Sequence, residues 1–145
     1  MPLPTKADEM FCFAVYSASH LINRAYAPML REMGLTYPQY ITLTMLWESD
    51  AQTVGALSKR LRMDTNTLTP LLKRLEKLGH LNRQRDPKDE RRVIIRLTPS
   101  GRGLQKKAPE IVRCMVEATG MTPAKLEELV TTLGELSTGL SREKA

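Results

Sequence analysis

Cys12 and Cys114 are the two side chains of this 145-residue sequence that could carry thiol redox chemistry. They stand 102 positions apart in a chain where we expect no secretion signal, a pattern that does not fit a disulfide-stapled scaffold. Neither cysteine has another Cys or a His at metal-ligand spacing, and His20 and His80 are isolated. The sequence therefore predicts no metal site, and each histidine is interpreted as a surface or structural residue.

Positive charge is the second chemical feature, and it is concentrated between residues 59 and 96. That segment holds twelve Lys or Arg against five Asp or Glu, whereas the rest of the chain holds ten against eleven. The formal net charge of +6 thus comes from one segment. Such a segment is typical of a face that binds a polyanion, because phosphate contacts supply most of the non-specific affinity for nucleic acids. The alternative is an ordinary solvated charged surface.

Polar side chains in this segment are of the types that contact DNA. Thr65 and Asn66 open a predicted helix with a hydroxyl and an amide that can meet base edges in the major groove, and Asn66 is the best candidate for base recognition. Further along the helix, Lys73, Arg74 and Lys77 can reach phosphates. The candidate DNA-binding residues are Thr65, Asn66, Thr67, Thr69, Pro70, Lys73, Arg74, Lys88 and Arg91.

The run DPKDER at residues 86–91 predicts the turn of a narrow hairpin. It presents Lys88 and Arg91, with Asp86 and Asp89 placed to hold an arginine. Such a finger suits the minor groove, which is recognised by its shape and favours Arg. The flanking strands are expected at 81–85 and 92–98.

Helical periodicity predicts the elements around the hairpin. Apolar residues at steps of three and four indicate a first helix over about 7–33. Thr36 and Thr53 are N-cap signals for two shorter helices, expected to end near Trp47 and Leu61. The expected buried face of the first of these is Tyr40, Ile41, Leu43, Thr44 and Leu46. Two more helices are expected after the hairpin, from 98 or 100 to about 118 and from 124 to about 140.

A stripe of leucines predicts the helix that precedes the hairpin. Leu68, Leu71, Leu72, Leu75 and Leu78 would face the core, and Gly79 would end the helix with a left-handed cap. Pro70 conflicts with this because propensity alone favours it at the first helical position, but the stripe indicates a start near Thr65. Two short helices joined by a tight turn fit a helix-turn-helix. The predicted fold class is mainly α with a small β-hairpin wing.

Size and hydropathy bound the class of protein. A chain of 145 residues fits one domain. Its apolar runs are broken well short of the roughly 20 residues that a membrane span needs, and residues 1–9 lack the basic-then-apolar order of a signal peptide. We therefore expect a single cytoplasmic domain.

Two stretches carry a resemblance to a known family. The run LTPLLKRLEKLGHLNRQRDPKDERRVIIRLTPSG resembles the winged helix-turn-helix of MarR-type transcription regulators, and the resemblance extends over nearly the whole chain. More narrowly, FCFAVYSASHLINRAY together with GLTYPQY resembles the organic hydroperoxide resistance regulators, OhrR, which sense peroxides through an N-terminal cysteine. The resemblance implies a winged helix-turn-helix MarR-type dimer on a pseudo-palindromic operator, with no cofactor and no membrane partner.

The resemblance also implies a role for each part of the chain. Residues 1–145 would form a single MarR-type domain, with dimerisation helices at 6–35 and 99–141 and the winged DNA-binding region at 53–98. Arg91 would enter the minor groove, and residues 65–73 would contact the major groove. Cys12 would be the peroxide-reactive thiol. The phenols around it would come from Tyr16, Tyr26 and Tyr37.

Helix geometry limits how those phenols meet Cys12. Tyr16 is one turn away and within reach, whereas Tyr26 is fourteen residues further along, which is about 21 Å of helix. If Tyr26 touches Cys12, it must belong to a second subunit whose first helix runs antiparallel, which predicts a two-fold dimer. The apolar neighbours Met10, Phe11, Phe13 and Val15 favour an organic peroxide over hydrogen peroxide, as a hypothesis.

A thiol sensor needs thiolate character, access and a means of trapping its sulfenic acid. Cys114 is the natural resolving thiol, and we expect its disulfide with Cys12 to join two subunits after some helix movement, because the Cα atoms of a disulfide lie within about 7 Å. The alternative for either cysteine is a small buried hydrophobe. The resemblance to members with a second cysteine is weakened by the variable position of that residue among them.

The predicted function is a repressor that binds operator DNA when reduced, with recognition helices about 34 Å apart, and leaves it when organic hydroperoxide oxidises Cys12. A first alternative is a MarR-type repressor that responds to a small aromatic ligand, with incidental cysteines. A second is a thiol peroxidase, which the scarcity of strand signals disfavours, so we expect no enzyme. A third is a non-specific architectural DNA binder.

Overall fold

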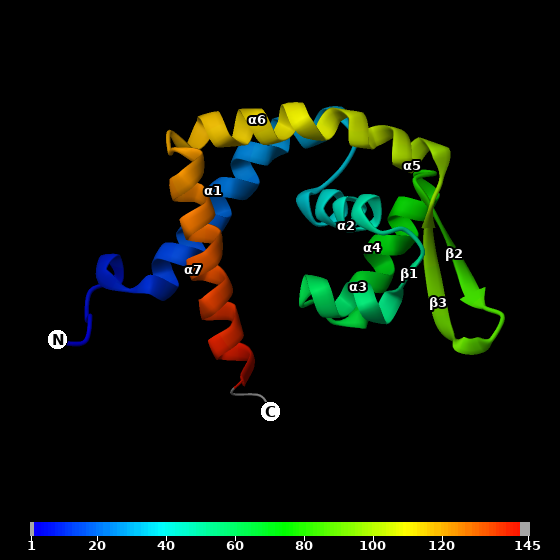
Figure 1. The fold of residues 1–145 in the computed structure, drawn as a ribbon, viewed down its shortest axis with the longest axis horizontal. Coiled ribbons are helices and arrows are strands. Elements are labelled where there is room, and N and C mark those ends of the chain that lie inside the picture. Colours follow the sequence, from blue (N-terminus) through cyan, green and yellow to red (C-terminus); the bar gives the residue numbers. More distant parts are fainter. Residues whose placement is uncertain (1, 143–145) are drawn as a thin grey trace. The chain divides into compact units, whose positions relative to one another are not determined.

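The computed structural model describes residues 2–142 of the chain (Figure 1). One compact unit ends at Ala108 and a second begins at Pro109. No helix in the described part of the chain is long and apolar enough to cross a membrane. The elements in chain order are η1 (Ala7–Glu9), α1 (Phe11–Glu32), α2 (Tyr37–Glu48), β1 (Gln52–Thr53), α3 (Val54–Leu61), α4 (Thr65–Lys77), β2 (Leu81–Asp86), β3 (Asp89–Leu97), α5 (Pro99–Gly103), η2 (Leu104–Lys107), α6 (Ala108–Thr119) and α7 (Pro123–Arg142).

Capping side chains set the start of the two helices that precede α4. Thr36 begins α2 with a reciprocal pair of bonds: Gln39 N donates to Thr36 Oγ1 at 3.4 Å, and Thr36 N donates to Gln39 Oε1 at 2.9 Å. Thr53 begins α3 by accepting from Ala56 N at 3.1 Å. Both predicted helices are confirmed. The buried face of α2 differs from the prediction, because Gln39 and Thr42 are buried whereas Ile41 and Thr44 are half-buried.

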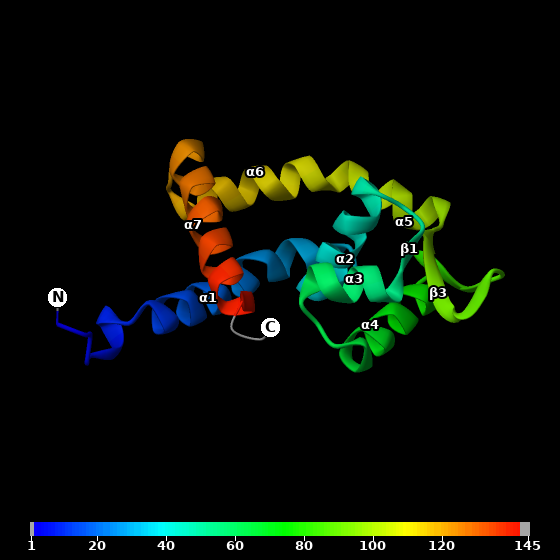
Figure 2. The same ribbon diagram turned by 60° about the horizontal axis from the view of Figure 1, so that its bottom comes forward.

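The helix predicted from the leucine stripe is α4, and it starts at Thr65 despite Pro70. Leu68, Leu72 and Leu75 are each at most 1% exposed and pack in the core formed with α2 and α3. Figures 1 and 2 show α2, α3 and α4 gathered beside the β2–β3 hairpin. Leu78 was expected in this stripe but is 49% exposed, because the helix ends at Lys77 and Leu78 only caps it.

The hairpin is longer and its turn shorter than the sequence predicts. β2 and β3 pair from Leu81 with Leu97 to Asp86 with Asp89, so that only Pro87 and Lys88 lie between the strands. The turn was expected over 86–91. It is tighter because Lys88 N donates to Asp86 Oδ1 at 2.9 Å, a local bond that folds the chain back.

A third strand, β1, was not predicted. Its two residues, Gln52 and Thr53, pair antiparallel with Ile95 and Ile94 of β3, so the sheet order is β1-β3-β2. Two residues are too short to show the alternation that identifies a strand in a sequence. The pairing anchors the start of α3 against the hairpin.

The first helix and the helix after the hairpin also differ from expectation. The α-helical part of the first begins at Phe11, because Met10 is extended and only a 3-10 turn precedes it. The continuous helix predicted from about 98 to 118 is divided into α5, the 3-10 segment η2 and α6. Two glycines, Gly101 and Gly103, lie in its first five residues and weaken the α-helical preference there.

The second unit contains most of α6 and the whole of α7. Thr122 begins α7 by accepting from Lys125 N at 3.2 Å, and Gly120 before it takes a φ of +65° that favours glycine. The last predicted helix is therefore confirmed.

Gly101 forms a close backbone junction in the first unit. Trp47 Nε1 donates to Gly101 O at 2.9 Å, and Gly101 N donates to Thr98 Oγ1 at 3.1 Å. A Cβ atom at Gly101 would overlap the carbonyl group of His80, which follows α4. The end of α2, the segment after α4 and the start of α5 thus meet at a residue that has no room for a side chain.

Gly101→Ala should lower the free energy of unfolding by about 2 kcal/mol, because the new methyl group must displace the His80 backbone. Gly103→Ala is the matched control on the same helix, since a Cβ there meets nothing within 4 Å. It should leave stability unchanged or raise it by up to about 1 kcal/mol. Urea unfolding followed by circular dichroism at one protein concentration measures both. Equal midpoints for the two variants would contradict the junction.

Candidate functional site

The first turn of α4 presents polar side chains to solvent. Thr65, Asn66 and Thr67 are exposed, and Thr69 is half-buried one turn further. Pro70, Lys73, Arg74 and Lys77 lie on the exposed face as well. The leucines on the opposite side of α4 pack in the core, so the helix is held with this polar face toward solvent.

The hairpin tip presents cations from its short turn and from the start of β3. The Arg91 side chain is 91% exposed. Asp89 Oδ1 accepts hydrogen bonds from Arg91 Nε at 3.2 Å and from Arg91 N at 3.1 Å. Asp86 lies 4.0 Å from Arg92 Nη1, and Lys88 is exposed. Exposed ion pairs contribute little to stability, so these aspartates orient the arginines and leave them available to an anion.

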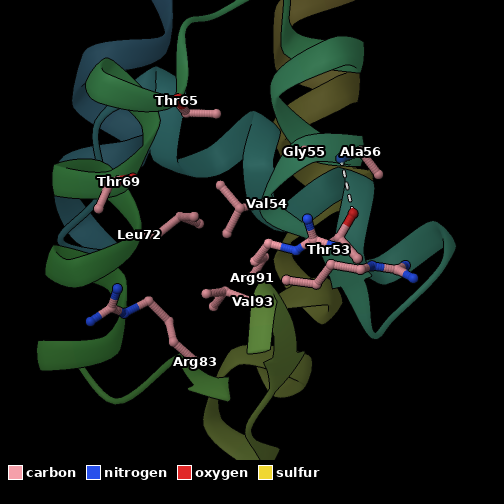
Figure 3. Close-up of a pocket in the computed structure, with 11 residues that line it drawn as sticks. Thr53, Val54, Gly55, Ala56, Thr65, Thr69, Leu72, Arg83, Arg91 and Val93 are labelled. Carbon is pink, nitrogen blue, oxygen red and sulfur yellow. Dashed lines mark hydrogen bonds between the residues drawn. The ribbon is translucent and has the colours of Figure 1, made fainter. Parts of the chain in front are cut away.

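A hollow of about 530 Å³ lies between α4, the start of α3 and the hairpin. Figure 3 shows Thr65, Thr69 and Leu72 on α4 along one side, Val54 and Val93 toward the middle, and Arg91 on the strand side. The residues that line it are Thr53, Val54, Gly55, Ala56, Thr65, Thr69, Leu72, Arg83, Arg91, Arg92 and Val93. The hollow therefore joins predicted helix residues and predicted hairpin residues in one surface.

Thr53, Arg83 and Arg92 belong to this surface and were missed by the sequence analysis. The excess of basic residues in 59–96 indicated that arginines of this segment could bind an anion. The residues around Arg83 and Arg92 in the sequence gave no way to distinguish them from ordinary solvated arginines. Arg83 also fixes the hairpin to α4: its backbone N donates to Glu76 Oε2 at 2.8 Å and its Nε lies 3.3 Å from Glu76 Oε1. The spacing between helix and hairpin is thereby constrained by a half-buried carboxylate.

Cys12 is an exposed free thiol in the first turn of α1. Tyr16, expected beside it, is 63% exposed, and its ring packs edge-on against His20 with centroids 4.5 Å apart. No hydrogen bond joins Cys12 to Tyr16 within residues 2–142. The structure thus places both residues on the same helix without bringing the phenol to the thiol.

Tyr26 and Tyr37, the other two expected phenols, do lie together. Their ring centroids are 4.8 Å apart, and Tyr40, which was not predicted as part of this group, lies 5.9 Å from Tyr26. Burial, followed by the nearby Tyr37 and Tyr40, raises the pKa of Tyr26 to about 12. Burial likewise raises the pKa of Tyr37. Both phenols therefore stay neutral at physiological pH and keep a proton to donate.

Uninterrupted helix separates this tyrosine group from Cys12. Because α1 runs without a break from Phe11 to Glu32, Tyr26 lies fourteen residues after Cys12 on one helix, a rise of about 21 Å. The three expected phenols consequently do not form one pocket around Cys12 within a single chain.

Cys114 is a half-buried free thiol on α6, in the second unit. Its Sγ donates to Glu110 Oε1 at 3.6 Å, and Arg113 Nη2 lies 4.0 Å from the sulfur. Burial of the thiol, and after it the hydrogen bond to Glu110 and that carboxylate's charge, raise the pKa of Cys114.

The arrangement of α3, α4 and the β2–β3 hairpin defines a winged helix-turn-helix. Comparison with known proteins agrees. A family described as transcriptional regulator SarA/Rot matches residues 24–108. The regulator TtmR of Methylorubrum extorquens is 45% identical over 133 residues, which cover 92% of this chain and 68% of that protein. The organic hydroperoxide resistance transcriptional regulator of Bacillus subtilis is 37% identical over 128 residues, covering 88% and 87% of the two chains.

Solved structures of AbfR, a protein of Staphylococcus epidermidis, are also similar. The reduced form bound to DNA has a TM-score of 0.78 and 32% identity, with 92% of each chain covered. The disulfide form has a TM-score of 0.65 and 38% identity, with 86% of this chain and 88% of that chain covered. The chain belongs to the MarR family of transcriptional regulators, of the SarA/Rot type.

Asn66→Ala should weaken binding to a duplex that the wild-type protein selects from random DNA by about 1–3 kcal/mol and relax the base preference at one position. Lys73→Ala, on the same exposed face, is the matched control: it should weaken binding to every sequence and reduce the salt slope by about one. Fluorescence anisotropy on the selected and a scrambled duplex measures both. An unchanged ratio between the two duplexes for Asn66→Ala would exclude that residue from base recognition.

Proposed function

We propose that this regulator is a redox-sensing repressor, which binds operator DNA as a homodimer when Cys12 is reduced and leaves it when an organic hydroperoxide oxidises Cys12. The observation that carries the proposal is the combination of an exposed free thiol at the start of α1 with an organised basic surface on α4 and the wing. Its similarity over most of its length to an organic hydroperoxide resistance regulator and to AbfR, solved in reduced and disulfide forms, supports it.

The DNA-binding half rests on the shape and charge of the first unit. The α4 N-terminus enters the major groove with Thr65, Asn66 and Thr67, while Arg91 on the wing reaches the adjacent minor groove. Between them, the apolar floor of the hollow and its arginine rim fit the sugar-phosphate backbone. The similar structure of reduced AbfR bound to DNA supports this use of the surface.

The dimer is supported by exposed apolar side chains on helices in the described part of the chain. On α1, Phe11, Tyr16, Leu21 and Ile22 are between 44% and 63% exposed. On α7, Leu129, Val130, Leu133 and Leu140 are between 37% and 72% exposed. Helices with such faces are stable in water only against a partner, and a second copy supplies the same faces. The second copy would also bring its own Tyr26 and Tyr37 to this chain's Cys12, which the length of α1 forbids within one chain.

The redox step conserves atoms and electrons. The Cys12 thiolate attacks one oxygen of the hydroperoxide, and the O–O bond breaks. The alkoxide takes up a proton from solvent and leaves as an alcohol, while Cys12 becomes a sulfenic acid. The Cys114 thiol then loses its proton and attacks the Cys12 sulfur, the S–O bond breaks, and the hydroxide takes up a proton and leaves as water as the disulfide forms. Cys12 lies in the first compact unit and Cys114 in the second. A disulfide between them would therefore link a first unit to a second unit only in the oxidised protein.

Release by a small aromatic ligand is a second candidate function. A hollow of about 450 Å³ lies between the end of α1 and the start of α2, with apolar walls from Ala27, Leu30 and Leu35. Arg31 and Tyr37 at its edge could bind a carboxylate and a ring. DNA release that needs such a ligand and ignores both peroxide and reductant would favour this candidate.

Cys12→Ser should bind the selected duplex with wild-type affinity and keep it when cumene hydroperoxide is added, because the oxidisable sulfur is gone. Cys114→Ser is the matched control, since it removes the other thiol and leaves Cys12 to accumulate as a sulfenic acid that a dimedone probe labels. Anisotropy measures retention, and mass spectrometry locates the label. Peroxide-induced release by Cys12→Ser would rule out Cys12 as the trigger.

Non-reducing electrophoresis of peroxide-treated wild-type protein should show a band of twice the chain mass that dithiothreitol removes. We expect this because the disulfide between Cys12 and Cys114 is proposed to join two subunits. Cys12→Ser and Cys114→Ser should each lack the band. A treated wild-type protein that migrates only as a monomer would contradict the intersubunit bond.

A further inference from the structure

Cys114 belongs to a compact group of charged residues on the exposed side of α6. Glu110 precedes it by one turn and accepts its S–H at 3.6 Å. Arg113 donates from Nη2 to Glu110 Oε1 at 2.5 Å and from Nη1 to Glu117 Oε1 at 2.6 Å. Arg113 is thus engaged by two carboxylates, one on each side of it along the helix.

The charge of this group opposes ionisation of the thiol. Glu110, Arg113 and Glu117 are the charged residues within residues 2–142 that act on Cys114, and all three are on α6. Two carboxylates against one guanidinium leave one net negative charge beside the sulfur. A thiolate would add a second negative charge and would lose the hydrogen bond that the S–H now donates.

Cys12 forms no comparable hydrogen bond. Asp8 and Glu9 precede it by four and three residues, but they lie in η1, which the extended Met10 separates from α1. No hydrogen bond joins Cys12 to a carboxylate in the described part of the chain. The two thiols of this protein therefore sit in different electrostatic surroundings. Because peroxide reacts with the thiolate, the surroundings decide which sulfur is oxidised first.

We propose that Glu110 is a specificity-determining residue, which holds Cys114 as a protonated thiol and so directs the hydroperoxide to Cys12. The inference rests on the redox function proposed above and assigns the order in which its two cysteines react. Glu110 touches neither the oxidant nor Cys12 in this role; it acts through the sulfur of Cys114. Cys114 enters only after Cys12 has become a sulfenic acid, and it attacks once the proton that it donates to Glu110 has been lost to solvent.

The test measures the reactivity of Cys114 in the full-length Cys12→Ser protein, where it is the single cysteine. Its alkylation rate with iodoacetamide is followed across a pH series, with Glu110 unchanged and with Glu110→Gln. Loss of the carboxylate should move the midpoint of the profile to lower pH and raise the rate at pH 7 about two- to fivefold. The plateau at high pH should not change, because it reports access to the sulfur rather than its ionisation.

Two controls separate the charge of Glu110 from a structural effect. Glu110→Asp keeps a carboxylate and should return the midpoint toward its original value. Glu117→Gln breaks the other bond to Arg113 but leaves the acceptor of the S–H in place, so its shift should be smaller. An unchanged midpoint for Glu110→Gln, or equal shifts for the two glutamine variants, would overturn the inference.

A second measurement uses the protein with both cysteines. With less than one equivalent of cumene hydroperoxide and a dimedone probe, the label should lie on Cys12 in the wild type and on both cysteines in Glu110→Gln. A normal alkylation shift without any label on Cys12 would show that the redox function fails while the role of Glu110 holds. A label confined to Cys12 in both proteins, with an unchanged midpoint, would show that the redox function holds while the role of Glu110 fails.

Discussion

The absence of a side chain at Gly101 allows the backbone of α5 to lie against the carbonyl group of His80. Trp47 from α2 donates to the same residue, and Thr98 links the neighbouring backbone through its bond to Gly79 O at 2.5 Å. One backbone junction therefore holds the end of the helix core, the residues after α4 and the end of β3. The orientation of α4 relative to the wing depends on it, and so does the shape of the hollow between them.

Around this junction, two kinds of interaction position the surface of the first unit: apolar packing and ion pairs. Buried leucines on α4 hold the recognition helix without contacting its polar face. The half-buried Glu76 ties Arg83 of the wing to α4, and the half-buried Asp86 and Asp89 orient the exposed arginines beside the turn. The side chains proposed to bind DNA can therefore stay solvated until phosphates replace the water, while the contacts that fix their spacing lie on other faces of the elements.

Regular patterns in the sequence predicted most elements of the fold. The steps of three and four located α1, the leucines located α4 even against Pro70, and threonine caps located the starts of α2 and α3. Helical periodicity and N-caps depend on residues close in sequence, so the folded chain retains the helices that they predict. The strand β1 was missed because it forms only by pairing with the distant β3. The divided helix after Thr98 and the exposure of Leu78 were missed because the exact ends of helices are weakly marked in a sequence.

The residues of the candidate sites were likewise predicted in part from the sequence. The polar face of α4 and the cations of the turn were predicted, but Thr53, Arg83 and Arg92 enter the hollow only because α3, α4 and β3 converge. Helix length correctly separated Tyr26 from Cys12, whereas the contact of Tyr16 with His20, four residues further along the predicted helix, was overlooked. Glu110 and Cys114 stand four residues apart, a helical spacing whose meaning appeared only with the hydrogen bond between them.

Oxidation of a thiol is proposed to control DNA binding by this protein. This redox control is tested most directly by anisotropy of the wild-type protein on its selected duplex at one fixed salt concentration, first reduced, then with cumene hydroperoxide, then with excess dithiothreitol. We expect tight binding, loss of binding on oxidation, and recovery with the dithiol. Affinity that is unchanged by hydroperoxide while Cys12 becomes oxidised would contradict it.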